Sequence, residues 1–111
     1  MASEYSIRMD YARAQAAAAK LDEVADGIER MMEHDYPDIL GDVRYNWKGE
    51  NADRFQGKSE EVREKMLTVV KRLRETANTI RTIAKNTYDA EMRALEIARA
   101  REFAERQQRM K

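Results

Sequence analysis

Apolar and polar positions follow a helical period along almost the whole chain. In the first half, apolar or small residues recur three, four and seven positions apart, which predicts one face of a helix from about residue 5 to about residue 45. Ser3 or Ser6 is the candidate cap at its start. The rows are Ile7, Ala14, Leu21 and Ile28, and beside them Tyr11, Ala18, Ala25 and Met32; Val24, Met31, Ile39, Leu40 and Val43 continue the stripe.

Pro37 interrupts the first of these patterns. It offers no backbone N–H and disfavours helical geometry at the residue before it. We therefore expect a kink or break near Asp35–Pro37, followed by a short helix to about Tyr45.

The second half is longer and more regular. No Gly or Pro follows Gly57, so a helix from about residue 51 is expected to continue beyond Thr87. Two rows with a spacing of seven form an a/d seam of about five heptads. They are Phe55, Val62, Val69, Thr76 and Ile83, and Ser59, Met66, Leu73, Ile80 and Thr87, with Leu67, Val70 and Ala77 beside them.

After Tyr88 the apolar pattern becomes sparse and the sequence ends in the polar stretch REFAERQQRMK. We predict one domain, a helical hairpin over residues 1–90. Residues 91–111 are predicted to be a helical extension that frays into a polar tail.

The segment NWKGEN joins the two helical halves at residues 46–51. Gly49 can adopt a positive φ without steric cost, which suits a tight turn over residues 46–50. Because the connection is short, the helices should lie antiparallel, and the fold class is all-α. Trp47 has two interpretations that stay open: it covers the end of the hairpin core, or it is partly exposed and a partner recognises it.

Charge and composition reduce the number of functions that the chain could have. The chain has 111 residues, 38% of them charged and none of them cysteine, which excludes disulfides and thiol chemistry. Residues 1–46 hold ten acidic and five basic side chains; since the whole chain is neutral, the remainder carries +5. The basic groups of the second half are mixed with acidic ones, so we expect no nucleic-acid binding. No apolar run approaches the roughly 18 residues of a membrane span, so we expect no stable membrane insertion, and no signal peptide is evident.

The sequence contains no pattern typical of a catalytic or metal-binding site. His34 is the single histidine, and its neighbours Glu33 and Asp35 point around a helix rather than toward it, so we interpret it as a solvated side chain. Glu60 and Glu61 are interpreted as solvated surface. There is no nucleophile–base set and no phosphate-binding glycine loop. We therefore predict a protein that is not an enzyme and has no catalytic residues, metal or cofactor.

The turn carries a longer motif. Trp47, Gly49, Ala52 and Phe55 read W-x-G-x-x-A-x-x-F, centred between two amphipathic halves. Over roughly residues 5–90 the chain resembles the WxG family, the small early-secreted-antigen-like proteins of bacterial type VII secretion. The resemblance implies a helical hairpin that dimerises into a four-helix bundle. It also implies export by a membrane-embedded ATPase without a cleaved signal.

One departure concerns the signal that such proteins or their partners carry, a tyrosine followed four residues later by an acidic residue. Tyr88 stands in the corresponding place, but its acidic neighbours are Asp89 and Glu91, and the fourth position is Met92. We treat Tyr88, Asp89 and Glu91 as a candidate degenerate secretion signal. A partner that supplies the complete signal is then an alternative to self-sufficient export.

Physical reasoning on its own favours association. A two-helix hairpin leaves a wide apolar stripe exposed, and a second hairpin would bury it in an elongated four-helix bundle. The partner is this chain itself or a WxG-like helical protein. The predicted core and dimer seam consists of Leu21, Val24, Ile28, Met31, Val62, Met66, Val69, Leu73, Ile80 and Ile83.

Three functions follow as hypotheses. The first is a small substrate or structural partner of type VII secretion, cytoplasmic before export and then secreted, with the export ATPase as a partner. The second is an intracellular adaptor that pairs with the helical N-terminal segment of a larger toxin. The third is a generic coiled-coil scaffold, which would leave Trp47 and Gly49 without a role.

Overall fold

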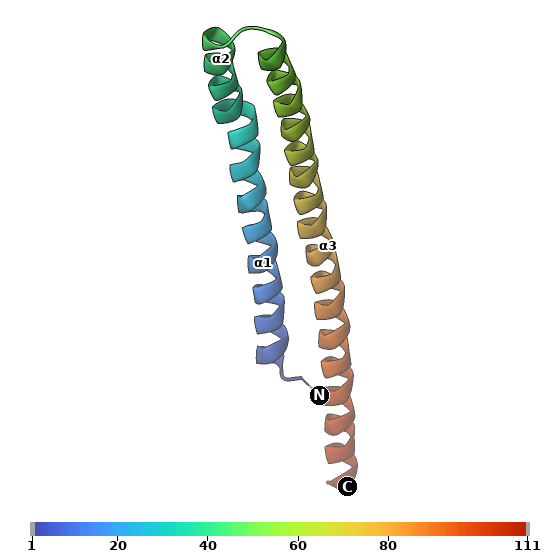
Figure 1. Cartoon of the computed structure of the whole chain (residues 1–111). Coiled ribbons are helices and arrows are strands. Elements are labelled where there is room, and N and C mark those ends of the chain that lie inside the picture. Colours follow the sequence, from blue (N-terminus) through green and yellow to red (C-terminus); the bar gives the residue numbers. More distant parts are fainter. Residues whose placement is uncertain (1, 111) are drawn as a thin grey trace. The chain divides into compact units, whose positions relative to one another are not determined.

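A computed structural model describes residues 2–110, and all of its secondary structure is helical. Helix α1 spans Glu4–Arg30, a π-helical turn η1 spans Met31–Asp35, α2 spans Tyr36–Asn46 and α3 spans Glu50–Arg109 (Figure 1). The predicted all-α helical hairpin is confirmed. The division at residue 90 and the fraying of the extension stay predictions, because the structure describes helix as far as Arg109.

The chain divides into two compact units. Residues 19–77 form one, here called the turn unit. Residues 1–18 and 78–111 form the other, the terminal unit, which the structure describes for residues 2–18 and 78–110. In each unit a segment from the first half of the chain lies beside a segment of α3 (Figure 1).

A serine cap starts α1, as the sequence predicted. Ser3 Oγ accepts a hydrogen bond from the backbone N–H of Ser6 at 3.1 Å, and the Ser3 carbonyl accepts one from the N–H of Ile7 at 3.0 Å. Of the two candidates, Ser3 is therefore the cap. It satisfies one of the N–H groups that the first turn of a helix leaves without an internal partner.

The turn unit packs through mostly small side chains. Ala25, Met32 and Leu40 are buried on one side, and the buried residues of α3 are Ala52, Ser59, Val70 and Ala77. Arg74 joins the two sides at the surface, 2.9 Å from Asp26 and 3.1 Å from Glu29. These carboxylates, Asp26 first, raise the pKa of Arg74. Because solvent screens such exposed pairs, they contribute little to the stability of the unit.

The terminal unit buries Ile7 and Ala18 and brings the rings of Tyr11 and Tyr88 to a centroid distance of 4.8 Å. Leu95 and Ala98 on α3 are half-buried, and every described residue from 99 to 110 is exposed. Arg99 is paired with Glu4 at 3.3 Å. The hydrogen bonds from Arg8 and then Arg99 lower the pKa of Glu4.

The π-helical turn corrects a change of register in the first half of the chain. Ala25 and Met32 are buried seven positions apart, but the next buried residue, Leu40, lies eight positions on. On the exposed side, Val24 and Met31 are seven apart and Ile39 is again eight on. A π-turn takes up one extra residue, so both faces keep their direction across it.

The predicted kink or break near Asp35–Pro37 is therefore a π-turn without a break in the helix. Asp35 keeps right-handed helical dihedrals, with φ of −67° and ψ of −45°. The N–H of Tyr36 reaches back five residues to the carbonyl of Met31. The sequence argument considered the missing N–H of Pro37 and the restriction on the residue before it, but not that a wider turn before proline relieves the clash of its ring with the preceding turn.

Arg63 completes the hydrogen bonding of this turn. In the π pattern the donor for the Met32 carbonyl would be residue 37, which is proline and has no N–H. Instead, Nε of Arg63 on α3 donates to the Met32 carbonyl at 2.7 Å. Met32 is only 5% exposed, so this carbonyl would otherwise lose most of its access to water. Tyr36 Oη adds a bond to the Ser59 carbonyl at 3.2 Å.

We predict that Arg63→Met destabilises the chain by about 1–3 kcal/mol, because it leaves the Met32 carbonyl without a donor. Pro37→Ala restores a backbone N–H at the position that faces this carbonyl. The same Arg63→Met change should therefore cost less in the Pro37→Ala background, which urea unfolding of the four variants measures as a double-mutant cycle. Equal costs in the two backgrounds would contradict this role of Arg63.

Candidate functional site

The turn between α2 and α3 is built by Trp47, Lys48 and Gly49. Trp47 leaves the helix with φ of −135° and ψ of 119°, while its N–H still donates to the Val43 carbonyl at 2.9 Å. Gly49 has a φ of 115°, a backbone conformation that is strained for any residue with a Cβ. Its carbonyl then accepts the N–H of Asp53 at 3.0 Å and begins α3. The positive φ predicted for Gly49 is confirmed.

The aromatic residues of the motif lie against each other at the turn. The ring centroids of Trp47 and Phe55 are 5.7 Å apart, with the planes tilted by 47°. Trp47 remains 45% exposed and Phe55 42% exposed. Ala52, the third apolar residue of the motif, is 3% exposed and lies in the core of the turn unit. Trp47 therefore packs on the hairpin end and is also partly exposed, and its recognition by a partner stays a prediction.

Polar contacts hold the two sides of the turn in place. Gln56 donates to the Leu40 carbonyl at 3.2 Å, and its oxygen accepts a bond from Arg44 at 3.3 Å. Asn46 donates to the carbonyl of Asp42 at 2.8 Å, which satisfies one of the last carbonyls of α2. Asn46 and Gln56, which make these bonds, are the direct sequence neighbours of Trp47 and Phe55.

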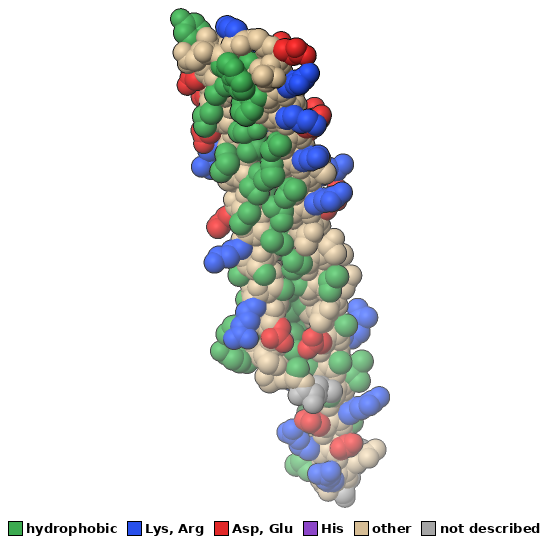
Figure 2. Space-filling model, in the orientation of Figure 1, with side chains coloured by type: hydrophobic (Ala, Val, Ile, Leu, Met, Phe, Trp, Pro, Cys, Tyr) green, Lys and Arg blue, Asp and Glu red, His purple; other side chains and the backbone are tan. Residues whose placement is uncertain are grey.

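An apolar surface extends from this turn. Figure 2 shows a face on which apolar side chains gather in a band with charged side chains at its edges. In the turn unit, besides Trp47 at the turn itself, six large apolar side chains are between 39% and 59% exposed. We call them the apolar face: Val24, Met31, Ile39, Phe55, Val62 and Val69.

The predicted seam residues divide into two groups in the structure. Leu21, Ile28, Met66, Leu73 and Ile80 are half-buried within the chain. Val24, Met31, Val62, Val69 and Ile83 are exposed, at 39–60% of their surface. Val70 and Ala77, which the sequence placed beside the seam, are buried in it, so sequence reasoning missed their role. Assignment of the exposed group to a dimer interface stays a prediction.

The candidate secretion signal lies in the terminal unit. Tyr88 is half-buried against Tyr11, and Asp89 pairs with Lys85 at 2.9 Å. The hydrogen bond to Asp89 raises the pKa of Lys85. Glu91 is half-buried and forms no ion pair with another residue of the described chain. The two acidic groups therefore differ, since one is held by a lysine and the other is not.

His34 lies exposed in the π-turn. Within residues 2–110, no three acidic or histidine side chains are grouped so that they could hold a metal ion. None of the helices described is both long and apolar enough to cross a bilayer.

A protein-family model described as "Proteins of 100 residues with WXG" matches residues 6–92. The chain belongs to this WXG100 family. The match includes Trp47 and Gly49 and ends just after the half-buried Glu91. No curated protein and no solved structure matches the chain.

Family membership determines the class of function. WXG100 proteins are small, non-enzymatic substrates of type VII secretion, and this chain is such a substrate. The family also implies dimeric partnering and secretion by the type VII route. The resemblance carried by the W-x-G-x-x-A-x-x-F motif is therefore confirmed.

We predict that Gly49→Ala destabilises the WXG100 turn by about 1 kcal/mol or more, because its φ of 115° is strained for any residue with a Cβ. Gly27→Ala is the matched control, since nothing lies within 4 Å of a Cβ at either position. Because Gly27 lies in the interior of α1, its replacement by alanine should instead stabilise the protein by about 0.5–1 kcal/mol. Thermal unfolding followed by circular dichroism distinguishes the two, and a stabilised Gly49→Ala protein would contradict the strain argument.

Proposed function

We propose that this WXG100 chain is exported as one half of a helical bundle, in which a second WXG-type hairpin covers the apolar face. The observation that supports this most is the exposure of six large apolar side chains on the turn unit. Covering a side chain of this size contributes about 1.5–3 kcal/mol when its burial is complete. A second hairpin offers the length and the helical period to cover all six together.

The partner proposed by default is a second copy of this chain. Its apolar face has three large apolar residues on each side of the hairpin, seven or eight positions apart, and a surface that matches itself gives a closed two-fold pair. A different WXG-type chain is the alternative outcome. Both kinds of pair leave Trp47, which lies outside the apolar face, at the edge of the interface, where the export ATPase or another component of the machine contacts it.

A second candidate function is supported by the acidic positions after Tyr88. Asp89 and Glu91 stand one and three residues after it, and Asp89 is already paired with Lys85. A chain with this incomplete signal would rely on a partner for recognition. It would then act in the cytoplasm as an adaptor for the helical N-terminal segment of a larger toxin. Whether the chain itself is exported would depend on that partner.

We expect Val62→Asp to weaken the pair by about tenfold or more, because the interface would then have to bury an unpaired carboxylate. Thr68→Asp, an exposed position on α3 outside the apolar face, is the control with the same change of charge. Light scattering across a dilution series measures the pair, alone and with WXG-type chains from the same host. A Val62→Asp protein that pairs as well as Thr68→Asp would argue against the apolar face as the interface.

We expect Trp47→Ala to reduce the extracellular amount of the chain while its helical content stays near that of the wild type, because Trp47 is 45% exposed. Tyr45→Ala is the control, since Tyr45 is a neighbouring aromatic residue that is 82% exposed. Culture supernatants are compared in the host with and without its type VII ATPase. If Trp47→Ala lowers stability but leaves ATPase-dependent export unchanged, Trp47 serves the fold alone.

A further inference from the structure

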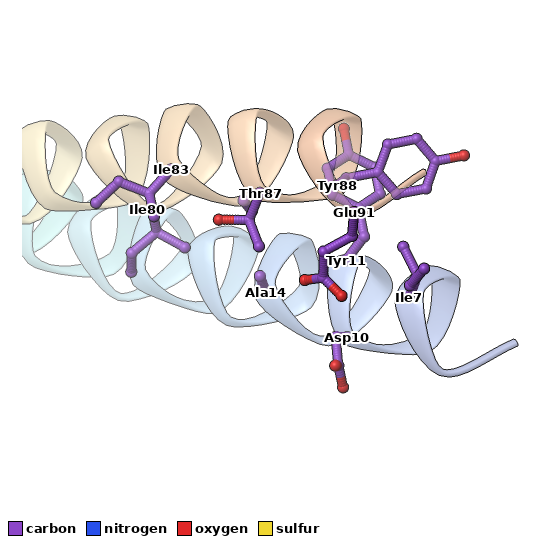
Figure 3. A pocket seen from close by; sticks show the side chains of 10 residues that line it. Ile7, Asp10, Tyr11, Ala14, Ile80, Ile83, Thr87, Tyr88 and Glu91 are labelled. Carbon is purple, nitrogen blue, oxygen red and sulfur yellow. The ribbon is translucent and has the colours of Figure 1, made fainter. Parts of the chain in front are cut away.

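The terminal unit contains a groove that the proposed export function does not use. The groove has a volume of about 260 Å³ and lies between α1 and α3 (Figure 3). Ile80 and Ile83 lie at one end of it, and the paired rings of Tyr11 and Tyr88 lie at the other. Ile83 is 60% exposed, so the isoleucine end is open to solvent.

One carboxylate is set into this apolar surface. Glu91 is half-buried, and Figure 3 shows it reaching from α3 toward α1 beside the tyrosine rings. Its carboxylate has no hydrogen-bond or ion-pair partner within residues 2–110. Two basic groups near the tyrosine rings are already paired, Arg8 with Glu4 at 3.0 Å and Lys85 with Asp89 at 2.9 Å. The groove therefore holds a negative charge that no neighbouring cation neutralises.

A second carboxylate lies at the edge of the groove. Asp10 belongs to the lining on α1, but it is exposed, and Figure 3 shows its carboxylate pointing away from α3. Asp10 adds to the negative potential around the groove. Of the two acidic side chains, only Glu91 is placed to touch a molecule that lies between the helices.

The lining favours a small organic cation with an apolar body. The volume is below the roughly 300–1,000 Å³ of pockets for drug-sized ligands, so the occupant is small. A hydrocarbon body would cover the two isoleucines and remove apolar surface from water. Its ammonium group would lie against a tyrosine ring and meet the carboxylate of Glu91. An anion of the same shape would be repelled, and a neutral molecule would leave Glu91 without a partner.

We propose that this groove binds a small apolar ammonium compound, with its hydrocarbon body beside Ile80 and Ile83 and its charged nitrogen at Glu91. The bound molecule would contact α1 and α3 at once, so its binding would stabilise the terminal unit. Every residue that lines the groove belongs to this unit, and none belongs to the apolar face. The site is therefore independent of the pair proposed above.

A set of compounds that differ in charge or length tests the proposal. Hexylamine is compared with its neutral analogue hexan-1-ol, its anionic analogue hexanoate and the shorter amine ethylamine. Nuclear magnetic resonance titration of the isotope-labelled full chain measures each affinity and locates the site. We expect hexylamine to shift the backbone amide signals of Ile80, Thr87 and Glu91, while the indole signal of Trp47, in the turn unit, stays in place.

The affinity for hexylamine should exceed that for each of the other compounds by about fivefold or more, because only hexylamine has both the charge and the apolar body. Equal affinity for any of the other compounds, or hexylamine shifts that lie outside the groove, would overturn the proposal.

Two substitutions with the same change of charge separate the carboxylates. Glu91→Gln should weaken hexylamine binding by about fivefold and leave hexan-1-ol binding unchanged, because only the amine meets the carboxylate. Asp10→Asn is the matched control and should change the affinity by less than about twofold, since solvent screens this exposed group. The proposal fails if Glu91→Gln binds hexylamine as tightly as Asp10→Asn does.

A larger side chain inside the groove tests where the hydrocarbon body lies. Ala14 is half-buried in the lining, so Ala14→Leu should lower the affinity for hexylamine by about tenfold or more by occupying the space. Ala17→Leu, at an exposed position of α1 outside the lining, should bind like the wild type. Circular dichroism checks that both variants keep their helical content. Unchanged binding by Ala14→Leu would place the compound elsewhere and overturn the proposal.

Val62→Asp separates this site from pairing through the apolar face. Its affinity for hexylamine should equal that of the wild type, because Val62 lies in the turn unit. Loss of hexylamine binding in this variant would show that a paired chain completes the site, which contradicts the proposal.

Discussion

Close packing through alanine is the constraint on which the rest of this structure depends. In the turn unit Ala25 and Ala77 are 0% exposed and Ala52 is 3% exposed, while Ala18 is 0% exposed in the terminal unit. Small side chains at these contacts allow the two helices to come near each other. They also bury little apolar area, and no large side chain is completely buried in the described chain. Several of the larger apolar residues stand on the outer face, so the chain folds with hydrophobic surface still uncovered, which agrees with the dimeric partnering that the WXG100 family implies.

The π-turn shows how one proline is accommodated within this packing. An extra residue between Met32 and Leu40 would rotate every later side chain of α2 by about 100° on an ordinary helix. The wider turn absorbs that residue, and Pro37 can then follow it without a clash. The arrangement leaves one carbonyl, that of Met32, to be satisfied from α3 by Arg63. Local sequence and tertiary contact are therefore linked at this point, and neither alone would hold the turn.

Much of the fold was accessible from the sequence because its signals are local. The helical period predicted the two halves, and Gly49 predicted the turn. The sequence could not decide which of two neighbouring apolar rows faces inward. Val69 and Val70 are adjacent and identical in type, yet Val69 is 39% exposed and Val70 is 4% exposed. That choice depends on the position of the other helix.

The contact of Arg63 with the Met32 carbonyl could not be predicted for the same reason, since 31 residues separate them. The motif residues were the easiest to find, because Trp47, Gly49, Ala52 and Phe55 lie close together in the sequence, at the turn and in the first part of α3.

The last part of α3 has a consequence for the alignment of the helices in the terminal unit. Leu95 and Ala98 end the half-buried row, and the next positions of that row, at three- and four-residue spacing, are Glu102 and Glu105. If α1 slid along α3 toward the end of the chain, its apolar residues would meet these carboxylates instead of Leu95. Within the terminal unit, the sequence of α3 therefore limits how far the helix pairing can extend as well as supplying the surface for it.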